Sequence, residues 1–309
     1  MQGRTRHFKK GGIFLKKSPK TNREKEFFTQ IKRDVYNSLA LNKYKYLLTA
    51  VLFLFFCFSF KELYGSMVFT GLIENRPSFG DTLVYIFSGM KEFVPDPNAN
   101  FEYPMIWLSC QVLICFLVGD YAPKDMTTYG QQYLIRSTHK SYWLIGKIIY
   151  CVLSVLTFYA VGYATVWCFN LFWGDPSIVF HDDVCGILTF IGTDQLTGTE
   201  LFFGVFLLPV LTSSVLAVFQ MTLSLLIKPI YSLLCTATYI SASAYYLSYV
   251  FIGNYSMMLR SKSVVETLSS TGGNCFDERI AIAVDCILIL MLYIVGMILM
   301  KKYDFLEKS

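Results

Sequence analysis

The most compact run of metal-ligand side chains in this sequence of 309 residues is His181, Asp182 and Asp183. Imidazole nitrogens and carboxylate oxygens ligate divalent cations, but consecutive residues point in divergent directions and share one ion poorly. The sequence also has no CxxC pair and no His/Cys cluster at zinc spacing. We therefore expect no metal site.

Motifs that carry catalysis are missing as well. Neither HExxH nor GxSxG occurs in the sequence, which disfavours a hydrolase. The fragment nearest to a phosphate-binding loop, GGIFLKKS at residues 11–18, lacks the second glycine and a flanking strand. We expect no catalytic residue and no cofactor bound by this chain, so any ATP that powers it, with its Mg²⁺, must bind another chain.

Two of the nine cysteines differ from the rest. Seven lie in or beside apolar runs, where cysteine behaves as a small hydrophobic residue. Cys185 and Cys275 lie in polar segments instead, and they are candidates for a disulfide.

Apolar runs are the elements that must position all of these side chains. With 54% hydrophobic and 17% aromatic residues, the chain has the composition of an integral membrane protein. A spanning helix needs about 20 mostly apolar residues. An all-α fold with six spans is expected, at about residues 44–62, 103–119, 142–173, 201–226, 230–252 and 280–300.

Basic residues lie on one side of these spans. Residues 1–45 carry thirteen Lys or Arg, whereas residues 174–200 carry none and hold five acidic residues. Cytoplasmic segments retain Lys and Arg, so the amino terminus is expected in the cytosol. Six crossings return the carboxyl terminus there, and the tail at 301–309 is indeed basic. The net charge of +5 then reflects orientation in the bilayer and does not indicate a nucleic-acid partner.

The interiors of the spans carry few polar groups. Gln111, Asn170 and Gln220 lie within them, whereas Asp120, Lys147, Glu200 and Asp285 are placed near their predicted ends. The three neutral residues are candidates for lining a substrate path, and interhelical hydrogen bonding is the alternative. Secondary transporters usually bury charges at mid-depth for ion coupling, and that pattern is not seen here.

Before the first span, residues 1–20 mix Gly, Lys and Arg without periodicity and are expected to be disordered. Thr21 and Glu24 have capping-box spacing, and apolar residues follow at helical intervals: Phe28, Ile31, Val35 and Leu39. Residues 21–43 are therefore predicted to form an amphipathic helix on the inner leaflet. The alternative is a helix that packs on a soluble partner.

Residues 120–141 are too long and too patterned for a simple turn between the second and third spans. Pro123 stops the preceding helix, and Asp125 or Thr127 can cap a new one. A short helix across the cytosolic face suits docking to a cytosolic partner, and a solvated connector is the alternative.

This combination resembles the membrane subunit of a type 2 ABC exporter. The six spans, the cytosolic termini, the amphipathic helix and the structured segment carry the likeness. The residues of this segment that resemble the family's motif are Gly130, Gln131, Leu134, Arg136, Ser137, Lys140 and Lys147. The acidic-Arg-Glu lead typical of the family is replaced here by residues 126–129.

The resemblance implies a role for the chain and for particular residues. Residues 120–141 would contain the coupling helix that docks to a separate ATPase subunit. The coupling residues would be Thr128, Gly130, Gln131, Leu134, Arg136 and Lys140. A second membrane subunit, the same chain or a related one, would complete a path for a peptide, an antibiotic or another amphipathic cargo. The expected location is the plasma membrane of a bacterium.

Two other functions stay open at this stage. A membrane scaffold or sensor that recruits a cytosolic partner would explain the basic segment before the first span. A membrane-embedded enzyme has no residue constellation behind it.

Overall fold

Helices form all the regular structure of the described residues, in agreement with the predicted all-α fold. The computed structural model describes residues 19–40, 42–95, 100–128, 130–131, 134, 140–268 and 274–302. Within this part of the chain there is no strand, and two isolated bridges join Ser78 to Asp175 and Ser261 to Phe276. The predictions for residues 1–18 and for the tail after residue 302 lie outside the described residues.

Five helical segments are long and apolar enough to cross a membrane. They coincide with five of the predicted spans. They are α2 (Lys43–Phe69), α4 with α5 (Met105–Val118 and Tyr121–Met126), α7 (Lys140–Trp173), α9 with η1 and α10 (Gly198–Phe202, Phe203–Leu207 and Leu208–Ser224) and α13 (Glu278–Lys302). The π-helical turn η1 immediately precedes Pro209, where proline removes a backbone hydrogen bond.

The predicted span at 230–252 is wrong in its extent. Helix α11 (Pro229–Tyr245) has 17 residues, fewer than the roughly 20 that a bilayer requires. The chain then continues into the short 3₁₀ helices η2 (Ile252–Ser256) and η3 (Met258–Arg260), both of them buried. Residues 252–260 are buried inside the protein, where η2 packs against α10 and α11.

A buried arginine explains why α11 ends where it does. The guanidinium of Arg260, which is 1% exposed, donates to the carbonyls of Ser243 and Ala244 in the last turn of the helix, at 2.7 and 2.5 Å. It also bonds to the Asn254 side chain and, at 3.1 Å, to the Met90 carbonyl. One side chain thus caps α11 and holds the following turns against it.

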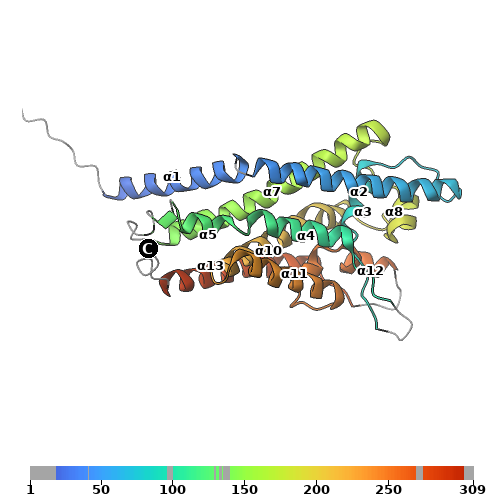
Figure 1. The fold of residues 1–309 in the computed structure, drawn as a ribbon. Coiled ribbons are helices and arrows are strands. Elements are labelled where there is room, and N and C mark those ends of the chain that lie inside the picture. The colour runs from blue at the N-terminus through green and yellow to red at the C-terminus, as the bar shows by residue number, and fades with distance from the viewer. Residues whose placement is uncertain are drawn as a thin grey trace, which may run out of the picture.

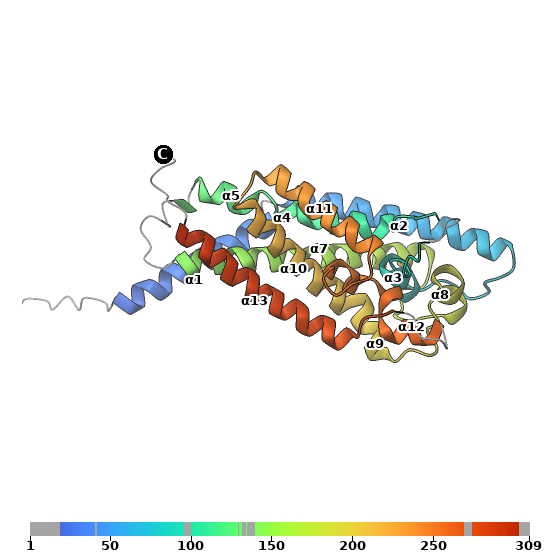
Figure 2. The ribbon, with the colours of Figure 1, turned by 90° about the horizontal axis from the view of Figure 1, so that it is seen from below.

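The helices form an elongated bundle whose two ends differ (Figure 1). One end holds α1, α5, the turn between α10 and α11, and the last turn of α13; both views agree on this (Figure 2). Lysines recur there, so this end is called the basic end: Lys43, Lys45, Lys124, Lys140, Lys228 and Lys301. The far end holds α3 (Phe79–Phe87), α8 (Asp182–Thr189) and α12 (Lys262–Leu268).

Helix α1 (Pro19–Ala40) covers most of the amphipathic helix predicted at residues 21–43. It begins at residue 19, so residues 19 and 20 do not belong to a disordered tail. In both views it runs along the bundle, roughly in line with α2 (Figures 1 and 2). It packs against α7, with the rings of Phe27 and Tyr142 4.8 Å apart. Its predicted apolar face is partly turned outward, since Phe28 is 67% exposed. The buried face is polar and includes Gln30, Asp34 and Ser38.

The 34-residue helix α7 is the axis on which the other elements assemble. It contacts α1, α2, α4, α10 and α13. Gly162 lies where the ring of Phe53 from α2 crosses α7, and a Cβ at this glycine would approach the ring to 2.5 Å. The same ring meets Phe158 one turn earlier, at a centroid distance of 5.7 Å. This close approach brings α1 and α2 together along α7.

Candidate functional site

A buried ion-pair network fastens three elements together at the basic end. The ammonium of Lys147, on α7, lies 2.7 Å from an oxygen of Asp34 on α1 and 2.8 Å from an oxygen of Asp125 on α5. The side chains of Lys147 and Asp34 are fully buried, and that of Asp125 is 6% exposed. A charge of this kind is stable inside a protein only when it is paired and hydrogen-bonded.

The remaining atoms of the two carboxylates are also satisfied. Arg33 donates to Asp125 at 3.0 Å, and the indole N–H of Trp143 donates to the same carboxylate at 2.8 Å. Asp34 accepts from the Tyr121 hydroxyl at 2.7 Å and from Gln30 at 3.0 Å. Two cations and two carboxylates therefore balance.

Aromatic rings enclose the central ammonium. It lies 4.4 Å from the centroid of the Tyr121 ring and 5.3 Å from that of Trp143, which adds cation–π attraction in a site without water contact. Tyr121 in turn stacks on Tyr150 at 3.8 Å, and Asn42 donates to the Tyr150 hydroxyl at 2.6 Å. The arrangement is that of a rigid clamp, hereafter the Lys147 clamp, and not that of a reactive centre.

Two glycines allow the elements to approach so closely. A Cβ at Gly146 on α7 would lie 2.5 Å from the Asp34 carboxylate. A Cβ at Gly130 would lie 2.5 Å from the Asp125 carboxylate and 2.8 Å from the Trp143 indole nitrogen. Gly130 therefore covers the Asp125–Trp143 hydrogen bond, and a larger residue at either glycine must displace part of the Lys147 clamp.

The predicted coupling residues lie beside this clamp. Thr128 is exposed, and its hydroxyl donates to the Lys124 carbonyl at 2.9 Å. Gly130 and Leu134 are buried. The Lys140 ammonium donates to the Met300 carbonyl at 3.1 Å, in the last turn of α13. Arg136 and Ser137 lie outside the described residues. Asp125, expected to cap a helix, lies inside α5 and belongs to the clamp instead.

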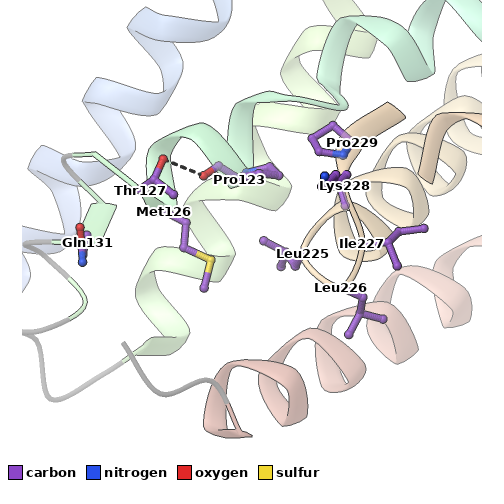
Figure 3. A pocket seen from close by; sticks show the side chains of 10 residues that line it. Pro123, Met126, Thr127, Gln131, Leu225, Leu226, Ile227, Lys228 and Pro229 are labelled. Carbon is purple, nitrogen blue, oxygen red and sulfur yellow. Dashed lines mark hydrogen bonds between the residues drawn. The ribbon is translucent and has the colours of Figure 1, made fainter. Parts of the chain in front are cut away.

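A groove of about 490 Å³ opens next to the clamp, between the end of α5 and the turn that joins α10 to α11 (Figure 3). Met126, Thr127 and Gln131 form one wall, and residues 224–229 form the other. Gln131 is thus the predicted coupling residue that reaches a surface recess.

The three candidate path residues all have partners within the chain. Gln111 accepts from the Ser213 hydroxyl at 2.9 Å, and Asn170 donates to the Thr82 hydroxyl at 3.2 Å. The Gln220 amide lies 2.9 Å from the Ser232 hydroxyl and 2.5 Å from that of Thr236. Each joins two helices, which is the packing role of a polar residue in a membrane bundle. Gln220 also borders a smaller groove between α4 and α11.

Several functional candidates were not found from the sequence. Asp34 is not among the predicted site residues, although Gln30, Asp34 and Ser38 recur every four residues and make one polar stripe. Asp285 was placed near a helix end, but it is fully buried and accepts from the Thr212 hydroxyl at 2.9 Å. Its other oxygen has no hydrogen-bond partner among the described residues.

The two cysteines proposed as a disulfide are free in the structure. Cys185 is buried in α8, where its thiol donates to the Asp81 carboxylate at 3.3 Å. Burial, and next the charge of Asp81, raise the pKa of the Cys185 thiol. It is therefore held as a hydrogen-bond donor of the α3–α8 contact, which leaves it unsuited to pairing with Cys275.

The acidic run that opens α8 is split among different partners. His181 bonds to Asp81 at 2.8 Å, Asp182 accepts from the Thr193 amide at 2.7 Å, and Asp183 accepts from the Asn75 amide at 3.3 Å. In the described part of the chain, no group of three or more His, Cys, Asp or Glu side chains is arranged to hold a metal ion. The run fixes loops around α3 and α8.

Comparison with known proteins gives one match. No curated protein and no solved structure matches the chain. Residues 47–306 match the profile of a family that is described as "Protein of unknown function (DUF2705)". The match includes α5, Gly130 and α7 with Lys147, and it begins after α1. Because it covers well over half of the chain, the protein belongs to the DUF2705 family.

Proposed function

We propose that this protein is the membrane-spanning subunit of a type 2 ABC exporter in a bacterial plasma membrane, with its basic end in the cytosol. In this proposal the chain crosses the bilayer six times. One of these six crossings consists of α11 together with the buried turns that follow it after residue 245. ATP and Mg²⁺ bind a separate ATPase subunit, since the sequence has no phosphate-binding loop of its own.

The observation that carries the proposal is the attachment of the predicted coupling segment to the bundle. Gly130 packs on the Asp125–Trp143 hydrogen bond, and Asp125 bonds to Lys147 of α7. A force applied to this segment is therefore transmitted to α7 and α1 through buried contacts and not through a flexible loop. Packed elements of this kind move as rigid bodies.

The groove beside the segment supports the same proposal. It lies at the basic end, and its walls come from α5 and from the α10–α11 turn (Figure 3). A partner seated there would contact two successive hairpins of the bundle. Closure of two ATPase subunits would then tilt both hairpins together and alternate access to a path between two membrane subunits. Such a mechanism needs no proton relay, and it suits a peptide, an antibiotic or another amphipathic cargo.

Isolation of the complex from its native membrane tests the proposal. The tagged protein, extracted in a mild detergent, is expected to bring down an ATPase that contains a phosphate-binding loop. Gly130→Leu, which displaces the Lys147 clamp, is expected to reduce the recovered ATPase by about tenfold, a typical coupling effect.

Gly65→Ala is the matched control, because a Cβ at this α2 glycine meets no atom within 4 Å. Helix content and thermal stability of each variant are measured in parallel. A full-length, folded protein that brings down no ATPase contradicts the proposal. If it recovers a different cytosolic partner instead, the scaffold function replaces that of an exporter.

A further inference from the structure

A second groove, of about 240 Å³, lies between α4, α11 and the first turn of α2. Its wall is mostly apolar and includes Phe116, Ile230 and Leu233, whereas Lys45 and Asp120 stand at one end. We propose that this groove binds one anionic phospholipid, with an acyl chain along the apolar wall and the phosphate next to Lys45. The proposal does not depend on the exporter function.

The apolar wall is continuous with an exposed apolar surface of the bundle. Phe116 is 50% exposed, Ile230 60% and Leu234 59%, and Leu47 on α2 is 63% exposed. All four lie on helices of the bundle, and α2 and α4 are among those long and apolar enough to span a bilayer. The groove is thus a recess in the lipid-facing surface, and its volume has the scale of an acyl segment.

The polar side chain at the floor of the groove is already hydrogen-bonded and needs no polar ligand. Gln220, the polar residue deepest in the wall, is fully buried and is already paired with Ser232 and Thr236. Gly119 leaves just enough room for it, since a Cβ there would lie 3.0 Å from the Gln220 amide nitrogen. A free phosphate or a sugar would therefore contact mainly carbon atoms along the wall.

Lys45 places a cation at the polar end. Its ammonium donates to the Leu117 carbonyl at 2.9 Å and to Asp120 at 3.3 Å, and its side chain is 27% exposed. An ammonium has three N–H donors, so one is left for a phosphate oxygen. Juxtamembrane lysines attract anionic headgroups in this way.

The charges around this end favour an anion over a zwitterion. Lys45 and Lys124 both pair with Asp120, and the distance from Lys45 is 3.3 Å. Two lysines thus meet one aspartate, which leaves a net local charge of about +1. The amino terminus of the 17-residue helix α11 also lies here, with its positive dipole end at Pro229 and Ile230.

Lipid retention by the purified protein, without any partner, tests the proposal. The protein in detergent is mixed with phosphatidylglycerol, phosphatidylcholine or inorganic phosphate, and bound molecules are counted by native mass spectrometry. One phosphatidylglycerol is expected to stay bound through collisional activation that removes phosphatidylcholine. Phosphate alone is not expected to displace it.

Variants separate the charged end from the apolar wall. Lys45→Gln with Lys124→Gln is expected to weaken phosphatidylglycerol binding roughly 5-fold per lysine. Lys124→Gln alone leaves the Lys45 hydrogen bonds intact and is expected to weaken binding by the smaller, single-lysine factor. Ile230→Trp, at an exposed rim position, is expected to block the bound lipid by filling the groove. Lys61→Gln, an exposed lysine of α2 away from the groove, is the control.

Two results would overturn the proposal. Equal retention of both lipids, unaffected by the lysine variants, would show ordinary bilayer contact. Displacement of phosphatidylglycerol by inorganic phosphate, with unchanged binding in Ile230→Trp, would show an anion site that does not use the groove. Neither result bears on recovery of an ATPase, so this proposal and the exporter proposal fail independently.

Discussion

Lys147 shows how much depends on single residues at the basic end. Its ammonium lies between two buried carboxylates, and four further side chains complete their hydrogen bonding. Burying such a network costs solvation energy, so its presence is poor evidence of added stability. What it provides is a single relative position for α1, α5 and α7, because partial loss leaves an unpaired charge inside the protein.

Lys147→Met is expected to lower the free energy of unfolding by about 3 to 5 kcal/mol, since the two carboxylates Asp34 and Asp125 would then share one partly exposed cation, Arg33. Unfolding in mixed micelles with increasing denaturing detergent measures the change. Lys262→Met is the control. Its partner Glu266 lies 3.7 Å away with both side chains about half-exposed or more, so a loss of less than about 1 kcal/mol is expected. Equal effects of the two variants would refute a special role for the Lys147 clamp.

At the scale of elements, the long contact of α2 with α7 depends on a missing side chain. Gly162 lets the ring of Phe53 lie directly against the α7 backbone, and aromatic pairs continue the contact towards the far end, from Phe58 with Phe169 to Phe60 with Trp173. Helices in a membrane gain little from the hydrophobic effect among themselves, so close packing of this kind holds them together.

Gly162→Ala is expected to destabilise the protein by about 1 to 3 kcal/mol, because the new methyl group would have to push the Phe53 ring aside. The control is Gly65→Ala in α2, where a Cβ meets open space. There the higher helix propensity of alanine is expected to stabilise by up to about 1 kcal/mol. The unfolding midpoint is expected to fall in Gly162→Ala and to rise in Gly65→Ala, relative to the unsubstituted protein. A destabilising effect of the same size at both glycines would contradict the packing argument.

For the whole molecule, the two ends of the bundle give the orientation in the membrane a direct test. The six lysines that define the basic end belong to segments at one end, and the acidic segment around α8 lies at the other (Figures 1 and 2). Cys275 precedes the bridge of Phe276 to Ser261 and is partly exposed. Lys228, in the turn between α10 and α11, is exposed at the basic end.

A maleimide that does not cross membranes is expected to label Cys275 on intact cells and to leave Cys275→Ser unlabelled. In the latter background, Lys228→Cys is expected to react only after permeabilisation. The thiolate is the reactive form, and burial, followed by the charge of Glu266, raises the pKa of Cys275. The labelling rate of Cys275 should therefore rise with pH, and the rise should occur at a higher pH than for an ordinary thiol. If Lys228→Cys reacted on intact cells and Cys275 reacted only after permeabilisation, the orientation in the membrane would be the opposite of the one proposed.

Much of this architecture was readable from the sequence. A run of about 20 apolar residues has few alternatives to a membrane helix, since every backbone polar group must be satisfied within the segment. Six spans were predicted on that basis, and five of them coincide with long apolar helices, whereas Gly130 was predicted from the resemblance of its segment to that of type 2 ABC exporters. The asymmetry of Lys and Arg likewise fixed which segments share an end of the molecule.

Only the tertiary structure decided what each buried group contacts. Residues 246–252 were expected to continue the span that begins at residue 230, but α11 ends at Tyr245, where Arg260 binds its last carbonyls. The polar stripe of α1 turned out to be its buried face, because Lys147 and Tyr121 offered partners to Asp34. Composition and periodicity determine whether a segment is removed from water. They do not distinguish a segment that contacts lipid from one that is buried in protein, because both surroundings are apolar. Which partner a buried charge finds is set by contacts between residues more than 80 positions apart, and these exist only in the folded chain.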